Sequence, residues 1–236
     1  MISMKTTIRI FLVLTVVLFS CRKAEDEPKI TMTTANAELR LSFGGMGSVL
    51  INFGDGVTDT ISCVDEWAEV THQYSSEALH TVTITGKVMG LDCEKNRLTT
   101  IDVSENPGIK SLYCSENQLT DLDVSKLSGL GNLACNKNLI KNLDVRKLTK
   151  LERLFCRNNQ LTSLNVSGLN QLDTISCQYN YMNADALNSL FTSLHTSSNH
   201  IGQLYVSNNG PNCDGSGTKD CDVTIAENKG WKVVWK

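Results

Sequence analysis

The sequence predicts a mainly β fold with short helices, in which a solenoid of repeated coils, with a parallel sheet on one face, follows a small β-sandwich-like domain. Five cysteines recur at intervals of 21 residues, at Cys93, Cys114, Cys135, Cys156 and Cys177. Five asparagines keep the same interval three positions later, at Asn96, Asn117, Asn138, Asn159 and Asn180. A fixed period of this length indicates units that bury a face only against their neighbours. Residues 30–88 lack the period.

Residues 1–20 have the pattern of a secretion signal. Lys5 and Arg9 form a short positive region, and a hydrophobic run too short to span a bilayer follows up to Phe19. The segment resembles the bacterial lipoprotein signal, which implies cleavage before Cys21, a lipid anchor on that cysteine and a linker over residues 21–29. The acidic residues that follow Cys21 are similar to a cell-surface export tag, although solvated linkers share this composition. The alternative is an ordinary secretory signal with an incidental cysteine.

Residues 30–88 alternate polar and apolar side chains between Gly-rich turns, as in a small antiparallel β domain. The segment from Phe53 to Gly56, then Tyr74 and residues 80–86, resembles the PKD-like β-sandwich pattern, with Phe53 where tryptophan is usual. We expect this domain to cover the open edge of the first repeat strand. Asp55 and Asp59 have the chemistry for calcium, but turn aspartates more often cap their own backbone.

Residues 89–209 form the repeats, of which LYCSENQLTDLDVSKLSGLGN, starting at Leu112, is one example. With the apolar residue three places before each unit, the frame is L-x-x-L-x-C-x-x-N-x-L, which is the leucine-rich-repeat pattern with cysteine in the third apolar position. The alternation around each cysteine predicts a short strand whose alternate side chains point inward. The asparagine follows where the chain leaves the strand, so its amide can pair backbone groups that the turn frees.

The repeated cysteines are expected to be free, buried thiols, because cysteine is among the most buried residue types. Zinc requires four converging ligands, which a straight column of parallel strands does not provide. Disulfides along the column are disfavoured because parallel Cβ vectors hold the side chains slightly too far apart. The sequence therefore predicts no metal and no cofactor.

The end of the chain departs from the repeat. Asn183 and the apolar spacing from Leu187 to Leu194 predict a capped helix, and residues 201–209 predict a sixth strand with valine in the cysteine position. Residues 210–236 are expected to form a C-terminal cap, with a short helix over 222–228 and a last strand over 231–235 whose tryptophans close the core. An exported protein can form disulfides, and Cys213 and Cys221 are the expected pair, which leaves Cys63 as a buried thiol.

Net charge limits the partners. Removal of residues 1–20 takes away two basic residues and no acidic ones, which leaves 20 basic against 25 acidic residues and a net charge of −5. Nucleic acids and anionic lipid surfaces are therefore poor partners.

Taken together, the signal, the β domain, the L-x-C-x-x-N-x-L-T-x-L-D-V-S frame and the ending from Ile225 to Trp231 resemble BspA-like surface leucine-rich-repeat lipoproteins of bacteria. The resemblance implies a non-catalytic, outer-membrane protein at the cell surface that binds an extracellular protein or glycan. It carries no catalytic residues, and we expect a monomer.

The outward positions of the repeat strands are the candidate ligand-binding residues. Tyr113, Phe155 and Tyr205 occupy one outward column and are expected to face solvent, while Arg153 and Arg157 flank Phe155. Aromatic and arginine side chains carry much of the energy of interfaces, and rigid aromatic rings also suit sugar stacking. The alternative is that isolated exposed aromatic residues need no functional explanation.

Enzyme function finds little support, because the sequence has no G-x-S-x-G, H-E-x-x-H or phosphate-binding glycine loop, and its four histidines lie outside the repeat strands. Besides adhesion, the sequence allows a structural or accessory lipoprotein of a glycan-uptake assembly whose repeat face binds nothing. Hydrolysis is a remote third possibility.

Overall fold

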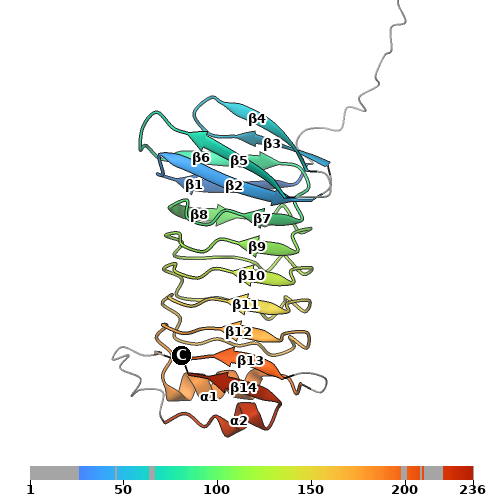
Figure 1. The fold of residues 1–236 in the computed structure, drawn as a ribbon, viewed down its shortest axis with the longest axis vertical. Helices are drawn as coiled ribbons and strands as arrows, with labels where there is room; N and C mark the ends of the chain where they lie inside the picture. Colours follow the sequence, from blue (N-terminus) through green and yellow to red (C-terminus); the bar gives the residue numbers. More distant parts are fainter. Residues whose placement is uncertain are drawn as a thin grey trace, which may run out of the picture.

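The computed structural model describes residues 27–45, 47–63, 67–197, 201–207, 209 and 220–235. The fold is mainly β with few helices, as the sequence predicts. Its described strands form a five-stranded sheet and a nine-stranded sheet. Figure 1 shows the nine-stranded sheet running along the molecule, with the first six strands at one end and the two helices at the other.

The N-terminal part contributes strands to both sheets. Its elements are β1 (Lys29–Thr34), β2 (Glu38–Gly44), β3 (Gly47–Asn52), β4 (Thr58–Cys63), β5 (Ala68–Gln73) and β6 (His80–Thr85). The five-stranded sheet has the order β4-β3-β6-β1-β8, where β8 (Leu98–Asp102) already belongs to the first repeat. Side chains alternate between buried and partly exposed along β1 and β2, so each strand turns one face to the core.

The repeats supply one short strand each to the nine-stranded sheet. These are β7 (Gly90–Asp92), β9 (Ser111–Tyr113), β10 (Asn132–Ala134), β11 (Arg153–Phe155), β12 (Thr174–Ser176) and β13 (Gly202–Tyr205). They run parallel, and equivalent residues pair from coil to coil, so every strand turns its leucine or isoleucine to the same side. The order β14-β13-β12-β11-β10-β9-β7-β2-β5 makes the sheet continuous with the N-terminal part.

The edge of the first repeat strand is covered, as expected from the sequence. Strand β2 pairs antiparallel with β7, placing Ser42 opposite Asp92 and Gly44 opposite Gly90. On the other side of the core, β8 pairs with β1. The boundary predicted between residues 88 and 89 is therefore crossed by both sheets, and the buried apolar residues of the two parts form one cluster.

The five repeated cysteines are completely buried, which confirms the inward column. The asparagine that follows each one links neighbouring coils. The Oδ1 atom of Asn117 accepts from the backbone N–H groups of Asn96 and Leu98, at 3.0 and 2.9 Å, and its Nδ2 donates to the carbonyls of Cys93 and Cys114, both at 3.0 Å. Similar bonds to the strand carbonyls recur at Asn138, Asn159 and Asn180.

The residue before each of these asparagines has a left-handed backbone, a feature that the sequence did not signal. The φ angles lie between 52° and 60° at Lys95, Glu116, Lys137, Asn158 and Tyr179. Side chains other than glycine rarely take this conformation, so its recurrence shows that the turn geometry overrides local preference.

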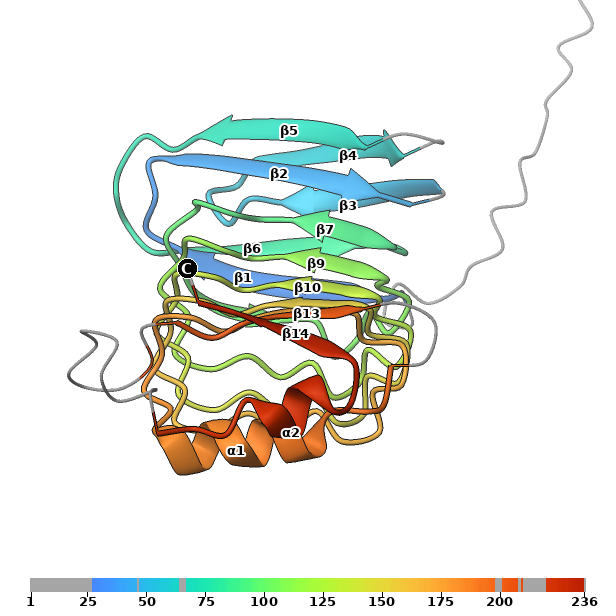
Figure 2. The same ribbon diagram turned by 60° about the horizontal axis from the view of Figure 1, so that its bottom comes forward.

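The C-terminal end follows most of the prediction. Helix α1 (Ala184–Ser193) begins after Asn183, whose Oδ1 accepts from the N–H of Ala186 at 2.9 Å. Figure 2 shows α1 and α2 (Thr224–Glu227) on the side of the coils opposite the sheet. Val206 is buried in the cysteine position, and Asn209 continues the asparagine series by accepting from the N–H of Asn180 at 3.2 Å.

The expectation that both terminal tryptophans close the core is wrong for one of them. Trp231, the first residue of β14 (Trp231–Val234), is 2% exposed and donates from Nε1 to the carbonyl of His195 at 3.0 Å. Trp235 lies beyond the strand and is 44% exposed, because no element packs over the outer edge of β14 within the described residues.

Several predictions concern residues outside the described part of the chain. These are the signal over residues 1–20, the anchor at Cys21, the partner cysteine Cys213 of Cys221, and the side chain of Cys63. Within the described ranges, no helix has the length and apolar composition needed to cross a bilayer.

Candidate binding face

The candidate site is the outward side of the nine-stranded sheet, which we call the sheet face. Strand pairing fixes its middle row. From β5 to β14 this row consists of Glu69, Ser42, Asp92, Tyr113, Ala134, Phe155, Ser176, Tyr205 and Val234. A ligand that crosses several strands would therefore meet side chains from both the N-terminal part and the repeats.

The aromatic residues predicted from the sequence lie on alternate repeat strands of this row. Tyr113, Phe155 and Tyr205 are separated by Ala134 and Ser176, which are only 6% and 7% exposed. Two strand spacings put neighbouring aromatic residues about 10 Å apart.

These three rings were expected to face solvent, and they do lie on the outward side of the sheet. Tyr113, Phe155 and Tyr205 are half-buried there. The two predicted arginines, Arg153 and Arg157, are exposed on either side of Phe155 and are the accessible charges at this position. The structure thus brings the five predicted residues onto one face, with the two arginines most accessible.

Trp67 is a candidate residue that the sequence reasoning missed. Its side chain is 46% exposed, and its ring centroid lies 6.0 Å from that of Tyr113, with 46° between the ring planes. The indole lies over Gly44 and Gly90, which pair directly across β2 and β7. A Cβ atom at Gly90 would approach the Cη2 atom of Trp67 to 2.7 Å, so the indole can take this position only over glycine.

The sequence did contain a signal for this arrangement: two glycines within strands, where glycine often marks the close approach of another group. What it did not contain was the pairing of β2 with β7, which brings the two glycines together under one ring. We call Trp67 and Tyr113 together the aromatic platform.

Next to Tyr113 the sheet face contains a pocket of about 290 Å3, which we call the polar pocket. Its lining comes from β2, β5 and the end of β7, and consists of Arg40, Leu41, Ser42, Glu69, Val70, Thr71, Asp92, Glu94 and Lys95. Asp92 pairs in register with Tyr113, so the polar pocket and the aromatic platform adjoin.

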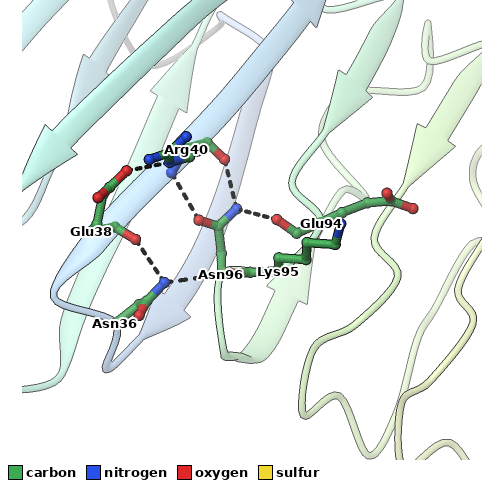
Figure 3. Close-up of polar contacts among 6 residues, drawn as sticks. All are labelled: Asn36, Glu38, Arg40, Glu94, Lys95 and Asn96. Atoms are coloured by element: carbon green, nitrogen blue, oxygen red, sulfur yellow. Dashed lines mark hydrogen bonds and ion pairs between the residues drawn. The ribbon is translucent and has the colours of Figure 1, made fainter.

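Asn96 holds residues of one wall of the polar pocket through hydrogen bonds, which Figure 3 shows. Its Oδ1 accepts from the N–H of Arg40 at 2.8 Å, and its Nδ2 donates to the carbonyls of Arg40 and Glu94, at 2.6 and 3.0 Å. Asn36 adds a bond from its Nδ2 to the carbonyl of Glu38 at 2.7 Å. The backbone of β2 is thereby joined to the turn that carries Glu94.

The charges around the polar pocket are mixed. Arg40 forms an ion pair with Glu38, and this hydrogen bond lowers the pKa of the Glu38 carboxyl below its usual value. Asp92 accepts from the N–H of Glu94 at 3.0 Å. With Glu69, Asp92 and Glu94 facing Arg40 and Lys95, the pocket offers acceptors and donors together and a small excess of negative charge.

A separate aromatic cluster lies in the N-terminal part. The rings of Phe53 and His72 stack with centroids 4.0 Å apart, and those of Tyr74 and His80 stack at 3.9 Å. The Nε2 atom of His72 lies 2.7 Å from the Oδ2 atom of Asp55. That contact and the bond from the N–H of Val57 lower the pKa of Asp55.

The two aspartates considered for calcium accept bonds from nearby backbone groups. Asp55 accepts from the N–H of Val57 at 3.0 Å, and Asp59 accepts from the N–H of Thr60 at 2.7 Å. No group of three or more His, Cys, Asp or Glu side chains that could hold a metal ion occurs among the residues that the structure describes.

Comparison with solved structures finds bacterial leucine-rich-repeat proteins. The functional domain of InlJ from Listeria monocytogenes, described as including a cysteine ladder, is 32% identical, with a TM-score of 0.46; the match covers 58% of this chain and 28% of that one. A leucine-rich-repeat protein of Leptospira interrogans is 19% identical, with a TM-score of 0.40; the match covers 56% of this chain and 38% of that one. The matches thus cover less than half of the length of each of these two solved structures.

No family model matches the chain, and no curated protein matches it.

Proposed function

We propose that this chain is a non-catalytic binding protein that attaches to an extracellular protein or glycan through its sheet face. The observation that supports this most is the middle row of the sheet face, where Tyr113, Phe155 and Tyr205 recur on alternate strands and the exposed Arg153 and Arg157 flank Phe155. Aromatic and arginine side chains in this arrangement are the types that most often dominate binding energy.

The location of the protein in the cell is part of the same proposal. A lipid anchor on Cys21 holds the protein at the bacterial outer membrane, with the sheet face directed outward. This arrangement is that of BspA-like lipoproteins. In the same proposal, the N-terminal part is a PKD-like domain. The support for the anchor is the hydrophobic run that ends just before Cys21. Metabolic labelling with an alkyne fatty acid tests it: label should enter the wild-type chain and be absent from Cys21→Ser.

The binding test compares two faces of the same protein. A triple variant, Tyr113→Ala with Phe155→Ala and Arg157→Ala, is measured against immobilised cells, matrix proteins and glycans. Its matched control combines Tyr181→Ala with Arg146→Ala, which removes an exposed tyrosine and an exposed arginine away from the sheet face. Loss of binding in the triple variant alone supports the proposal. Unchanged binding by a folded triple variant would instead favour the accessory role, with contacts through the N-terminal part.

A further inference from the structure

The exposed side chain of Trp67, at the sheet face, has an unusual support. Trp67 is held by two paired glycines, with Cδ2, Cε2 and Cζ2 above Gly44 and Cζ2, Cη2 and Cζ3 above Gly90. One side of the indole thus lies against the strand backbone, while 46% of the residue remains exposed. The exposed part of the indole is accessible to a ligand, and exposed aromatic surface of this kind is well suited to contact one.

Tyr113 gives this ring a partner of different orientation. The two ring planes meet at 46° with centroids 6.0 Å apart, so the aromatic platform presents two angled flat surfaces rather than one continuous apolar patch. Beside it, the polar pocket of about 290 Å3 is near the lower limit of small-molecule sites, which begin at about 300 Å3.

The charges of the polar pocket limit the classes of ligand that it can bind. Glu69, Asp92 and Glu94 supply carboxylate acceptors, and Lys95 supplies a donor, whereas the guanidinium of Arg40 is engaged by Glu38. The excess of carboxylates disfavours an anionic ligand. A protein partner usually meets an interface core depleted of charge, and this pocket is charged. A sugar ring has apolar C–H faces, on which aromatic rings can stack. It also has hydroxyl groups around its edge, which can donate hydrogen bonds to carboxylates. The aromatic platform and the polar pocket together match both kinds of surface.

We infer that Trp67 and Tyr113, with Asp92, Glu69 and Glu94 beside them, form a binding site for a sugar unit of an uncharged glycan. A sugar ring stacks on the indole of Trp67, and its hydroxyls donate hydrogen bonds to the carboxylates of the polar pocket. This inference rests on the proposed function, because it names the ligand class of the same face and places its centre where the N-terminal part meets the repeats.

The test uses the full-length chain in detergent and three sets of immobilised probes. Dextran, mannan, xylan and laminarin represent uncharged glycans, heparin represents an anionic glycan, and fibronectin and collagen represent proteins. We expect binding to at least one uncharged glycan, weakened about tenfold or more by Trp67→Ala. Binding of heparin or of a protein without any uncharged glycan would overturn the inference.

Two further variants separate this site from a general effect. Gly90→Ala keeps Trp67 in the chain but displaces its ring, so it should weaken glycan binding as Trp67→Ala does. Trp235→Ala removes a tryptophan of nearly equal exposure, 44%, at the opposite end of the sheet and should leave binding unchanged. Circular dichroism confirms that each variant is folded.

The outcomes also distinguish the inference from the proposed function. If Trp67→Ala binds glycan normally while Phe155→Ala and Arg157→Ala do not, the sheet face is the site but its centre is elsewhere, and the inference is wrong. If none of these variants changes binding, both the inference and the proposed function are wrong.

Discussion

The side chain of Asn96 binds both backbone polar groups of Arg40. Its Oδ1 accepts from the N–H of Arg40 at 2.8 Å, and its Nδ2 donates to the carbonyl of Arg40 at 2.6 Å. In the next coil, Asn117 likewise donates to the carbonyl of Cys93, in the coil before it. Strand β2 therefore occupies the place of a preceding coil, although its sequence has no repeat. The same side-chain chemistry thus joins the N-terminal part to the repeats.

Replacing Asn96 with alanine should destabilise the protein by about 2–4 kcal/mol, because its backbone partners at Arg40 and Glu94 lose their bonds at a site where Asn96 is 1% exposed. Urea unfolding measures the change. Asn142→Ala, at an exposed position, should alter the free energy of unfolding by less than about 0.5 kcal/mol. Equal effects at the two positions would contradict the assigned role of Asn96.

The repeated cysteines should resist alkylation in the folded protein. Burial raises the pKa of the thiols, to about 12 for Cys135 and Cys177, so the reactive thiolate is scarce at neutral pH. Iodoacetamide should therefore modify Cys93 to Cys177 only as fast as the protein unfolds, whereas addition of urea exposes them together. Mass spectrometry of peptides follows each site, and rapid modification of Cys135 in the native state would contradict its burial.

The same thiols should make the protein less stable in alkali. Their folded-state pKa exceeds the unfolded value of about 8.5, so above that pH the unfolded chain binds fewer protons and stability falls as pH rises. Urea midpoints at pH 8 and pH 10.5 measure the loss. Cys135→Val, which copies the residue at position 206 in the β13 coil, should reduce the loss, and an unchanged pH dependence would count against this account.

Acid should weaken the N-terminal part through Asp55. The bond to His72 lowers the folded-state pKa of Asp55, so its contribution to stability is present above the unfolded pKa of about 3.9 and is lost as pH falls through the folded value. Stability should therefore decline less steeply below about pH 4 in Asp55→Asn than in the wild type. Parallel declines measured by urea unfolding would show that the His72 contact has no such effect.

Gly202→Ala should cost about 1–3 kcal/mol, because a Cβ atom there would lie 2.5 Å from the Cδ2 atom of the buried Trp231. Gly129 provides the matched position, since a Cβ atom at this residue meets no atom within 4 Å. Gly129→Ala should be neutral in thermal unfolding. A stable Gly202→Ala protein would mean that Trp231 can shift without loss.

The 21-residue period predicted the inward cysteines and the bonding role of the asparagines. The helix after Asn183 was predicted from its capping residue and its helical spacing of apolar residues, which are likewise local signals. Trp67 was missed because its position depends on the pairing of Gly44 with Gly90, which are far apart in sequence. The left-handed backbone at Lys95 and Glu116 was missed for another reason: these residue types carry no preference for that conformation. The contact between Tyr113 and Trp67 likewise joins residues that are far apart in sequence.

The antiparallel pairing of β2 with β7 has a mechanical consequence. A flexible linker would let the repeats swing about the N-terminal part, but here hydrogen bonds bridge the junction in one sheet while β1 and β8 bridge it in the other. Bending at this point would break both ladders at once. The N-terminal part and the repeats are therefore rigidly connected. Any attachment that fixes the orientation of the N-terminal part also fixes the direction in which the repeats point.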